Sequence, residues 1–333
     1  PRHARKQTTL PGALCRRPEN YRKGGYTMDL LNTLFTQIVI MFLLMFLGAG
    51  LFRTGKISQE GTKSLGNVLI YVIMPAVVIK AFLTEFTTER LMGFGIAFAA
   101  SLASLILAMI ISTIFFKKHP IENFGTSFSN AGFIGIPIVS VVFGDEAVFY
   151  ASSFVALLNI LQWTYGVYVI TKDKSQISLK KIATNPVVLS LVVGFILFII
   201  PVELPSILTS TIKYCADMNA PIAMFSLGTY LAQLKIREIF NDKTVYVSTL
   251  FRLVIIPLLT IFLLCLVPAQ YEMIRMALLI VAATPVGSNV AIFAQIHNKN
   301  YTQAVKSVCM STICSIVTIP LLVSLAQRIW LAF

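Results

Sequence analysis

Long uncharged apolar stretches constrain this chain more than any other feature of its sequence. Residues 91–116 contain no Asp, Glu, Lys or Arg, and similar stretches occupy 31–52, 123–143 and 147–170. Apolar residues make up 56% of the chain and charged residues only 12%. Because a helix needs about 20 apolar residues to cross the hydrocarbon core of a bilayer, the sequence predicts an all-α polytopic membrane protein.

Ten transmembrane helices are predicted, and the loops between them are too short to form a soluble domain of any size. The predicted spans are residues 31–52, 64–83, 91–116, 123–143, 147–170, 186–201, 206–233, 244–267, 273–296 and 303–326. Residues 171–185, between the fifth and sixth spans, are predicted to be a connecting loop.

The basic residues of the loops predict the orientation of the chain, because cytoplasmic loops carry an excess of Lys and Arg. The loops after odd-numbered spans contain Arg53, Lys56, Lys63, Lys117, Lys118, Lys172, Lys174, Lys180, Lys181, Lys235, Arg237, Lys243, Lys299 and Lys306. The loops after even-numbered spans and the C-terminal end contain Arg90, Arg275 and Arg328. The odd-numbered loops, including residues 171–185, are therefore predicted to be cytoplasmic, with both termini outside the cytoplasm.

Residues 1–27 differ from the rest of the chain. They are strongly basic, which opposes the predicted orientation, and they lack the apolar stretch of a signal peptide. The sequence KGGYTM (Lys23 to Met28) can be encoded by AAA GGA GGT TAT ACA ATG, a bacterial ribosome-binding site followed by a start codon. We therefore expect residues 1–27 to be translated leader that is not native, and the protein to lie in a bacterial inner (plasma) membrane.

Two pairs of proline-containing motifs recur at nearly equal separations. Pro75 in YVIMPAVVI corresponds to Pro221 in MNAPIAMFSLG, and Pro137 in GFIGIPIV corresponds to Pro285 in AATPVGSNVAIF. This spacing predicts two five-helix repeats, residues 28–170 and 186–333. Because five is odd, the second repeat starts on the opposite face of the membrane, so the repeats are inverted.

The predicted spans 123–143 and 273–296 contain Gly, Pro and Asn, which interrupt a membrane helix. An interruption at membrane depth must line a protected cavity, because unpaired backbone groups are costly in lipid. Interrupted helices at corresponding positions of inverted repeats point to the binding site of a secondary transporter. The N-termini of the half-helices carry free N–H groups and a positive dipole end, which suit an anion.

Four motifs give the chain a family resemblance. The sequences SNAGFIGIPIVSVVFGDEAVFYASSF (129–154), NAPIAMFSLGTYLA (219–232), FRLVIIPLL (251–259) and ATPVGSNVAIFAQI (283–296) together resemble the auxin efflux carrier family. The resemblance implies a fold like that of sodium/proton antiporters, with crossing broken helices, a scaffold domain, elevator-like movement and a homodimer. Bacterial members are described as malate or malonate permeases. The long cytoplasmic loop of the plant members has no counterpart in residues 171–185.

The candidate substrate-binding residues cluster at the two predicted breaks. They are Asn130, Gly135, Pro137, Pro285, Ser288 and Asn289. An amide offers two donors and one acceptor, so each Asn can hold a carboxylate or can instead satisfy the interrupted backbone. The glycines also fit a simple role in close helix crossing, and the prolines a role in shaping the site without touching the ligand.

Other polar residues within the predicted spans are weighed as coupling or supporting groups. Lys213 and Asp217 lie one helical turn apart, shortly before Asn219, and form either a coupling site or a salt bridge near the membrane boundary. Asn159 and Gln162 either face the site or form interhelical hydrogen bonds. Arg252 either attracts an anion or extends to the cytoplasmic boundary.

The predicted function is secondary active transport of small organic anions, such as mono- or dicarboxylates. A cation/proton antiporter or a sodium-coupled symporter on the same fold is the alternative, although the predicted breaks contain no Asp or Glu. An intramembrane enzyme is disfavoured because His3, His119 and His297 all lie outside the predicted spans. No nucleotide-binding loop, metal-ligand spacing or nucleic-acid-binding face is evident, so we expect no cofactor beyond coupling to H⁺ or Na⁺.

Overall fold

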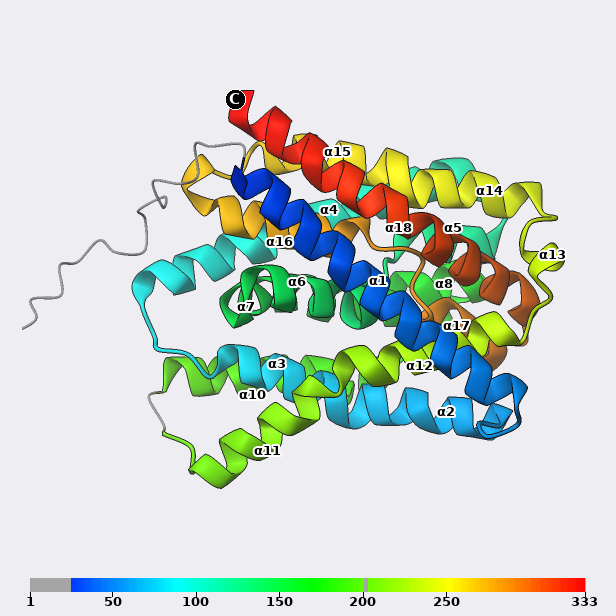
Figure 1. Cartoon of the computed structure of the whole chain (residues 1–333), viewed down its shortest axis with the longest axis horizontal. Coiled ribbons are helices and arrows are strands. Elements are labelled where there is room, and N and C mark those ends of the chain that lie inside the picture. The colour runs from blue at the N-terminus through cyan, green and yellow to red at the C-terminus, as the bar shows by residue number, and fades with distance from the viewer. Residues whose placement is uncertain (1–24, 201–202, 333) are drawn as a thin grey trace, which may run out of the picture.

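The computed structural model describes residues 25–200 and 203–332, and within these ranges every regular element is a helix (Figure 1). One isolated antiparallel bridge joins Ser129 to Val286. The predicted leader lies, apart from residues 25–27, outside the described residues. The helices run mostly along one direction, as expected for a chain that buries its apolar length in a bilayer.

Among the described residues, seven helices are long and apolar enough to cross a membrane. They cover residues 30–53, 59–82, 88–116, 145–171, 174–199, 243–264 and 301–331. The corresponding elements are α1 (Gly25–Arg53), α2 (Gln59–Val68) with α3 (Met74–Phe82), α4 (Thr88–Phe116), α7 (Asp145–Leu161) with α8 (Val167–Thr171), α9 (Leu179–Ala183) with α10 (Pro186–Ile199), α14 (Lys243–Leu250) with α15 (Ile256–Leu264), and α18 (Tyr301–Ala332).

The other three predicted spans are each divided into shorter helices. Residues 123–143 correspond to α5 (Pro120–Ser127) followed by η4 (Ala131–Gly135) and α6 (Ile136–Phe143), residues 206–233 to α11 (Ser206–Asp217) and α12 (Asn219–Ala232), and residues 273–296 to α16 (Glu272–Ala283) and α17 (Asn289–Ile296). The described residues therefore contain seven segments that are long and apolar enough to cross a membrane, where the sequence predicts ten spans, and one of the seven, 174–199, is interrupted between α9 and α10. Passage of the divided segments across the bilayer remains a prediction.

Pro75, Pro137 and Pro221 do not themselves break the helices in which they lie. Residues 59–82 continue through Pro75 because a π-helix, η3 (Leu69–Ile73), widens the preceding turn. The π-helices η4 and η7 (Phe251–Ile255) likewise end two residues before Pro137 and Pro257. A widened turn relieves the clash between the proline ring and the carbonyl four residues earlier. Pro221 does not itself break its span, because it lies in the first turn of α12 and the break falls at Met218.

The connection between the two halves is more ordered than the predicted loop. Residues 171–185 contain a 3₁₀ turn, η6 (Lys174–Gln176), and the short helix α9. Asn185 then begins α10, because its Oδ1 accepts the N–H groups of Val187 and Val188. An Asn at this position satisfies two donors that the first helical turn leaves free. The connection therefore has a defined conformation from which polar side chains can line a site.

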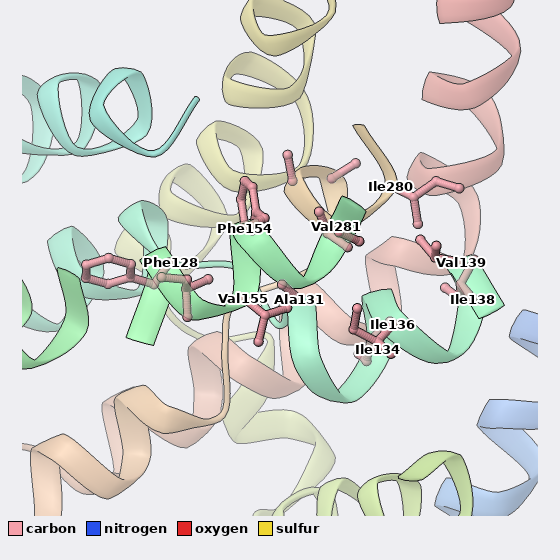
Figure 2. Packing of buried hydrophobic residues seen from close by; sticks show 14 of the residues in the cluster. Phe128, Ala131, Ile134, Ile136, Ile138, Val139, Phe154, Val155, Ile280 and Val281 are labelled. Carbon is pink, nitrogen blue, oxygen red and sulfur yellow. The ribbon is translucent and has the colours of Figure 1, made fainter. Parts of the chain in front are cut away.

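Two packing features hold the breaks in place. Helix α1 crosses α12 closely, since a Cβ atom on Gly228 would lie 2.0 Å from the carbonyl oxygen of Met45 (Figure 1). Figure 2 shows the apolar side chains around the first break, where Ile134 and Ile136 lie near Val155 of α7 and Val281 of α16. These side chains belong to one buried hydrophobic cluster. The breaks are thus embedded in packed helices, as an irregular backbone in a membrane requires.

Candidate functional site

The two predicted breaks contact each other directly. The N–H of Asn130 donates to the carbonyl oxygen of Pro285 at 2.8 Å, and the N–H of Gly287 donates to the carbonyl oxygen of Phe128 at 3.0 Å. These two bonds flank the bridge between Ser129 and Val286. The structure therefore brings together the residues around Asn130 and Asn289 that the sequence predicts to share one site.

Side chains from neighbouring helices satisfy further polar groups at the crossing. The Oγ of Ser129 donates to the carbonyl oxygen of Val281 at 2.8 Å. The N–H of Val286 donates to the Oγ of Ser311 in α18 at 3.0 Å. Because each of these bonds replaces one that a continuous helix would supply, the breaks are tolerated at the centre of an apolar protein.

A cavity of about 730 Å³ lies against this crossing. It is bounded by α2, α9, α10 and α12 on one side and by the crossing, α7 and α17 on the other. The described residues that line it include Ser129, Asn130, Gly132, Asn159, Trp163, Gly287 and Asn289 near the crossing, and Gln59, Lys63, Asn67, Lys181, Asn185, Tyr230, Gln233, Gln295 and Tyr301 elsewhere. Lys63 and Lys181 are its charged lining residues, and no Asp or Glu is among those described.

Buried amides at the crossing retain unused hydrogen-bonding capacity. The Nδ2 of Asn130 has no hydrogen-bond partner among the described residues. The Nδ2 of Asn289 donates to the Oε1 of Gln162 at 2.8 Å, which leaves Asn289 Oδ1 and Gln162 Nε2 unpartnered. Buried polar groups without partners are uncommon because they lose their bonds to water. The three unpartnered atoms, Asn130 Nδ2, Gln162 Nε2 and Asn289 Oδ1, make the crossing a candidate ligand site.

The remaining candidates at the breaks lie beside the larger cavity rather than in its lining. A Cβ atom on Gly135 would lie 3.0 Å from a methyl group of Val281, which fits the predicted role in close helix crossing. Pro285 accepts the N–H of Asn130, and Ser288 occupies the position before the first turn of α17. Pro137 lines a second cavity. Asn159 lines the larger cavity, with its Nδ2 bonded within its own helix to Val155.

The second cavity, of about 270 Å³, is lined by charged residues that neutralise one another. The Nζ of Lys80 lies 3.1 Å from Oδ1 of Asp145 and 3.7 Å from Oδ1 of Asp217. Asp217 also accepts a hydrogen bond from Lys213 at 2.7 Å, and both side chains of this pair are exposed. The structure thus places Lys213 and Asp217 away from the amide cluster, in an exposed ion-pair network.

The two cavities lie along the same helices, and the partition between them is where Asn219 contacts Gly132. In the span 59–82, residues from Gln59 to Met74 line the larger cavity, whereas Val77 and Lys80 line the smaller. Asn219 lies at the partition, because it lines the smaller cavity and its Nδ2 donates to the carbonyl oxygen of Gly132 at 3.2 Å. The cavities therefore approach the crossing from its two ends.

Arg252 does not extend to the membrane boundary, and that alternative is wrong. Its side chain is 2% exposed and lines neither cavity. One guanidinium nitrogen donates to the carbonyl oxygen of Thr126 at 3.0 Å, and the other donates to the carbonyl oxygen of Ala282. The reason is the tertiary packing. Helices α14 and α15 pack beside the crossing, so the guanidinium group donates to carbonyl groups of the protein instead of to water.

Sequence reasoning did not single out the charged and aromatic side chains of the larger cavity. The Nζ of Lys181 lies 5.3 Å from the centroid of the Trp163 ring, which in turn lies 4.7 Å from the ring of Phe293. Lys63 and Lys181 counted only as orientation signals in the sequence. A signal was nevertheless present, because Trp163 directly follows the candidate residue Gln162 in the predicted span 147–170.

Among its described residues, the lining of the larger cavity carries charge of one sign only, that of Lys63 and Lys181. Near it, at the C-terminal end of α17, burial holds the pKa of His297 below its usual range, and the positive charges of Lys181 and Lys299 add to this shift. Positive charge at the entrance of a cavity raises the local concentration of anions.

Comparison with known proteins identifies the family of this chain. The profile of a family described as membrane transport proteins matches residues 33–179 and 170–323. An uncharacterized transporter of Methanocaldococcus jannaschii is 23% identical over 236 residues, covering 66% of this chain and 76% of the relative. A protein of Rhizobium meliloti named provisionally as a malonate transporter is 22% identical over 300 residues, covering 85% of this chain and 93% of the relative.

The matched residues include both breaks, the amide cluster and the lysines of the larger cavity. Together with the membrane-length helices, the match makes this a multi-pass membrane protein. The chain belongs to the family of membrane transport proteins that includes the auxin efflux carriers.

Proposed function

We propose that this protein is a secondary transporter that binds a small carboxylate at the crossing of its broken helices. The observation that carries the proposal is the group of buried, unpartnered amide atoms of Asn130, Gln162 and Asn289 beside a cavity lined by two lysines. Amide N–H groups donate to a carboxylate, and a bound carboxylate would accept from the two unpartnered amide nitrogens, Asn130 Nδ2 and Gln162 Nε2.

The electrostatics of the site favour an anion. Helix α17 begins at Asn289, so its positive dipole end lies at the crossing. Lys63 and Lys181 add positive charge on the outer path, and no described carboxylate lines the cavity. A site for a divalent metal ion would need several oxygen ligands, among them carboxylates. The described residues contain no cluster of three or more His, Cys, Asp or Glu side chains.

The two cavities support alternating access. In this conformation the larger cavity reaches the amide cluster, and the predicted orientation places its outer end in the cytoplasm. The smaller cavity stops at the partition near Asn219 and is bordered by the ion pairs of Lys80. Movement of the crossing helices past α2–α3 and α12 exposes the site to the exterior. The family resemblance supports an elevator-like movement within a homodimer.

The substrate we propose is a mono- or dicarboxylate such as malonate or malate. The provisional name of the Rhizobium meliloti relative supports malonate. No nucleotide-binding loop is present in the sequence, so we propose that a gradient of H⁺ or Na⁺ drives transport. The bilayer in which this occurs is proposed to be the bacterial plasma membrane.

Transport in a defined system tests the proposal. Purified protein is placed in liposomes, and uptake of labelled acetate, malonate, malate and succinate is measured while pH and Na⁺ gradients are imposed one at a time. We expect at least one carboxylate to accumulate and unlabelled carboxylate to compete. Gradient-driven exchange of Na⁺ for H⁺ without any carboxylate uptake would contradict the proposal and support a cation/proton antiporter.

A further inference from the structure

Arg252 is the most deeply buried charged residue that the proposed carboxylate site does not use. It lies within the membrane-length helix 243–264, in the π-helix η7, and lines neither cavity. Its side chain is 2% exposed. An ionisable group at such a position is costly in lipid and therefore usually has a function.

The hydrogen bonds of Arg252 connect the two crossing segments. Thr126 is the residue before the last in α5, and Ala282 is the residue before the last in α16. Arg252 donates to the carbonyl oxygens of both. The carbonyl groups at a helix C-terminus lack intrahelical partners and carry a partial negative charge. One guanidinium group therefore joins and neutralises the C-terminal ends of the two half-helices that lead into the breaks.

No described carboxylate forms an ion pair with Arg252. Glu122, the buried acid of α5, instead accepts a hydrogen bond from Gln303 at 2.8 Å. The dipole ends of two helices amount to about one half negative charge each, so together they offset the charge of one guanidinium. Without Arg252, both negative helix ends would be left uncompensated next to the crossing.

We propose that Arg252 is a positioning and specificity-determining residue of this transporter. It clamps the ends of α5 and α16 so that the breaks stay in register, and its charge offsets the two negative helix ends that would otherwise repel an anion at the crossing. The second part rests on the proposed carboxylate site, whereas the first part concerns the protein alone. Arg252 acts through the crossing and does not contact the substrate.

Arg275 provides a matched control. It is also buried, and its guanidinium donates to the carbonyl oxygens of Val267 at 2.7 Å and Cys265 at 3.3 Å. It lies in the first turn of α16, at the opposite end of that helix from Ala282. Arg275→Gln thus removes a buried arginine and its carbonyl bonds without altering the crossing.

The clamp is tested on the purified protein without any substrate. Hydrogen–deuterium exchange is measured for peptides covering residues 126–135 and 282–290 in the wild type, Arg252→Lys, Arg252→Gln and Arg275→Gln. Because a lysine cannot bridge both carbonyl groups, we expect faster exchange of both peptides in both Arg252 variants. We expect wild-type exchange there in Arg275→Gln. Wild-type exchange in folded Arg252→Lys would overturn the clamp.

The charge is tested by malonate binding to the same four proteins. We expect Arg252→Gln to weaken binding about 10-fold, the effect of removing one charge at moderate distance and intermediate dielectric. Arg252→Lys and Arg275→Gln should stay within about 3-fold of the wild type. Equal affinities of Arg252→Gln and the wild type would overturn the electrostatic role. If the wild type binds no carboxylate, the proposed function and this electrostatic role both fail, while the exchange measurement still decides the clamp.

Discussion

The two cavities of this protein lie at the same crossing but differ in whether their charged groups are paired within the protein. The larger cavity is lined by Lys63, Lys181 and amides with free hydrogen-bonding groups. The smaller cavity holds Lys80, whose charge is matched by Asp145 and Asp217 at 3.1 and 3.7 Å. The larger cavity carries positive charge and unpaired amide atoms, whereas beside the smaller cavity the charges of Lys80 and Lys213 balance those of Asp145 and Asp217.

The difference suggests a division of labour. A cavity with unpaired buried polar groups is suited to binding a ligand, because the ligand removes the cost of leaving those groups without hydrogen bonds. A cavity lined by internal ion pairs is suited to closing the path across the protein, because its charged groups already have partners and a ligand adds few interactions. Under the proposed function, the larger cavity captures the substrate and the smaller one closes the path, with Asn219 at the partition.

Cysteine labelling gives the largest expected contrast between the cavities. In intact cells, a membrane-impermeant maleimide should label a single cysteine placed at Asp145, beside the smaller cavity, or at Glu203. It should not label a cysteine at Lys181, beside the larger cavity, or at Lys174 until the cells are opened. Labelling of position 174 from outside would contradict the orientation predicted from the basic loops and, with it, the inverted repeat.

Removing the amides at the crossing should have the next largest effect. Asn130→Ala and Asn289→Ala each delete a hydrogen-bond donor to the carboxylate, at a cost of about 1.5–3 kcal/mol or roughly 10- to 150-fold in affinity. Malonate binding measures this loss, and size-exclusion chromatography checks that both variants stay folded. Asn185→Ala is a control, because Asn185 lines the same cavity but caps α10. Unchanged affinity in both variants would remove the crossing from the site.

Neutralising the lysines of the larger cavity should have a smaller and salt-dependent effect. Lys63→Gln and Lys181→Gln should each weaken malonate binding about 2- to 5-fold at low ionic strength, and less in high salt because exposed charges are screened. Lys180→Gln, one residue along α9 and outside the cavity lining, is the matched control. An equal effect of Lys180 and Lys181 would show that net charge, rather than the cavity, matters.

The smallest effect is expected when an acidic residue of the smaller cavity is replaced and the pH dependence of transport is measured. Asp217 is half-exposed and paired with Lys213 and Lys80. We therefore expect Asp217→Asn to leave the pH dependence of uptake unchanged in liposomes. Loss of gradient-driven uptake with retained substrate exchange would instead assign Asp217 to proton coupling, since exchange does not require release of the proton.

The sequence predicted the helical fold and the crossing because these depend on local chemistry. The apolar stretch 91–116 predicted a helix that the structure places at 88–116, as α4. Pro, Gly and Asn residues indicated the breaks beside Asn130 and Asn289. The break at Met218 was shifted from the expected Pro221, because proline is tolerated in a first helical turn. Local signals locate an interruption but do not fix its residue.

The contacts across long sequence separations could not be predicted. Arg252 donates to carbonyl groups 126 and 30 residues away, and Asn289 donates to Gln162 at a separation of 127 residues. Lys181 reaches Trp163 only because α9 folds over the end of the larger cavity. These contacts depend on how helices pack, which the hydrophobic pattern of one sequence does not determine.

The central claim is that the crossing binds an anion. Comparing malonate affinity between the Ala and Asp substitutions at each asparagine tests it most directly. Malonate affinity is measured for the wild type and for Asn130→Ala, Asn130→Asp, Asn289→Ala and Asn289→Asp. If the crossing binds an anion, Asp must be worse than Ala at both positions, because it places a negative charge beside the carboxylate. If the asparagines only support the backbone, Asp replaces their acceptor function better than Ala. Tighter malonate binding by Asp than by Ala at both positions would contradict an anion site at the crossing.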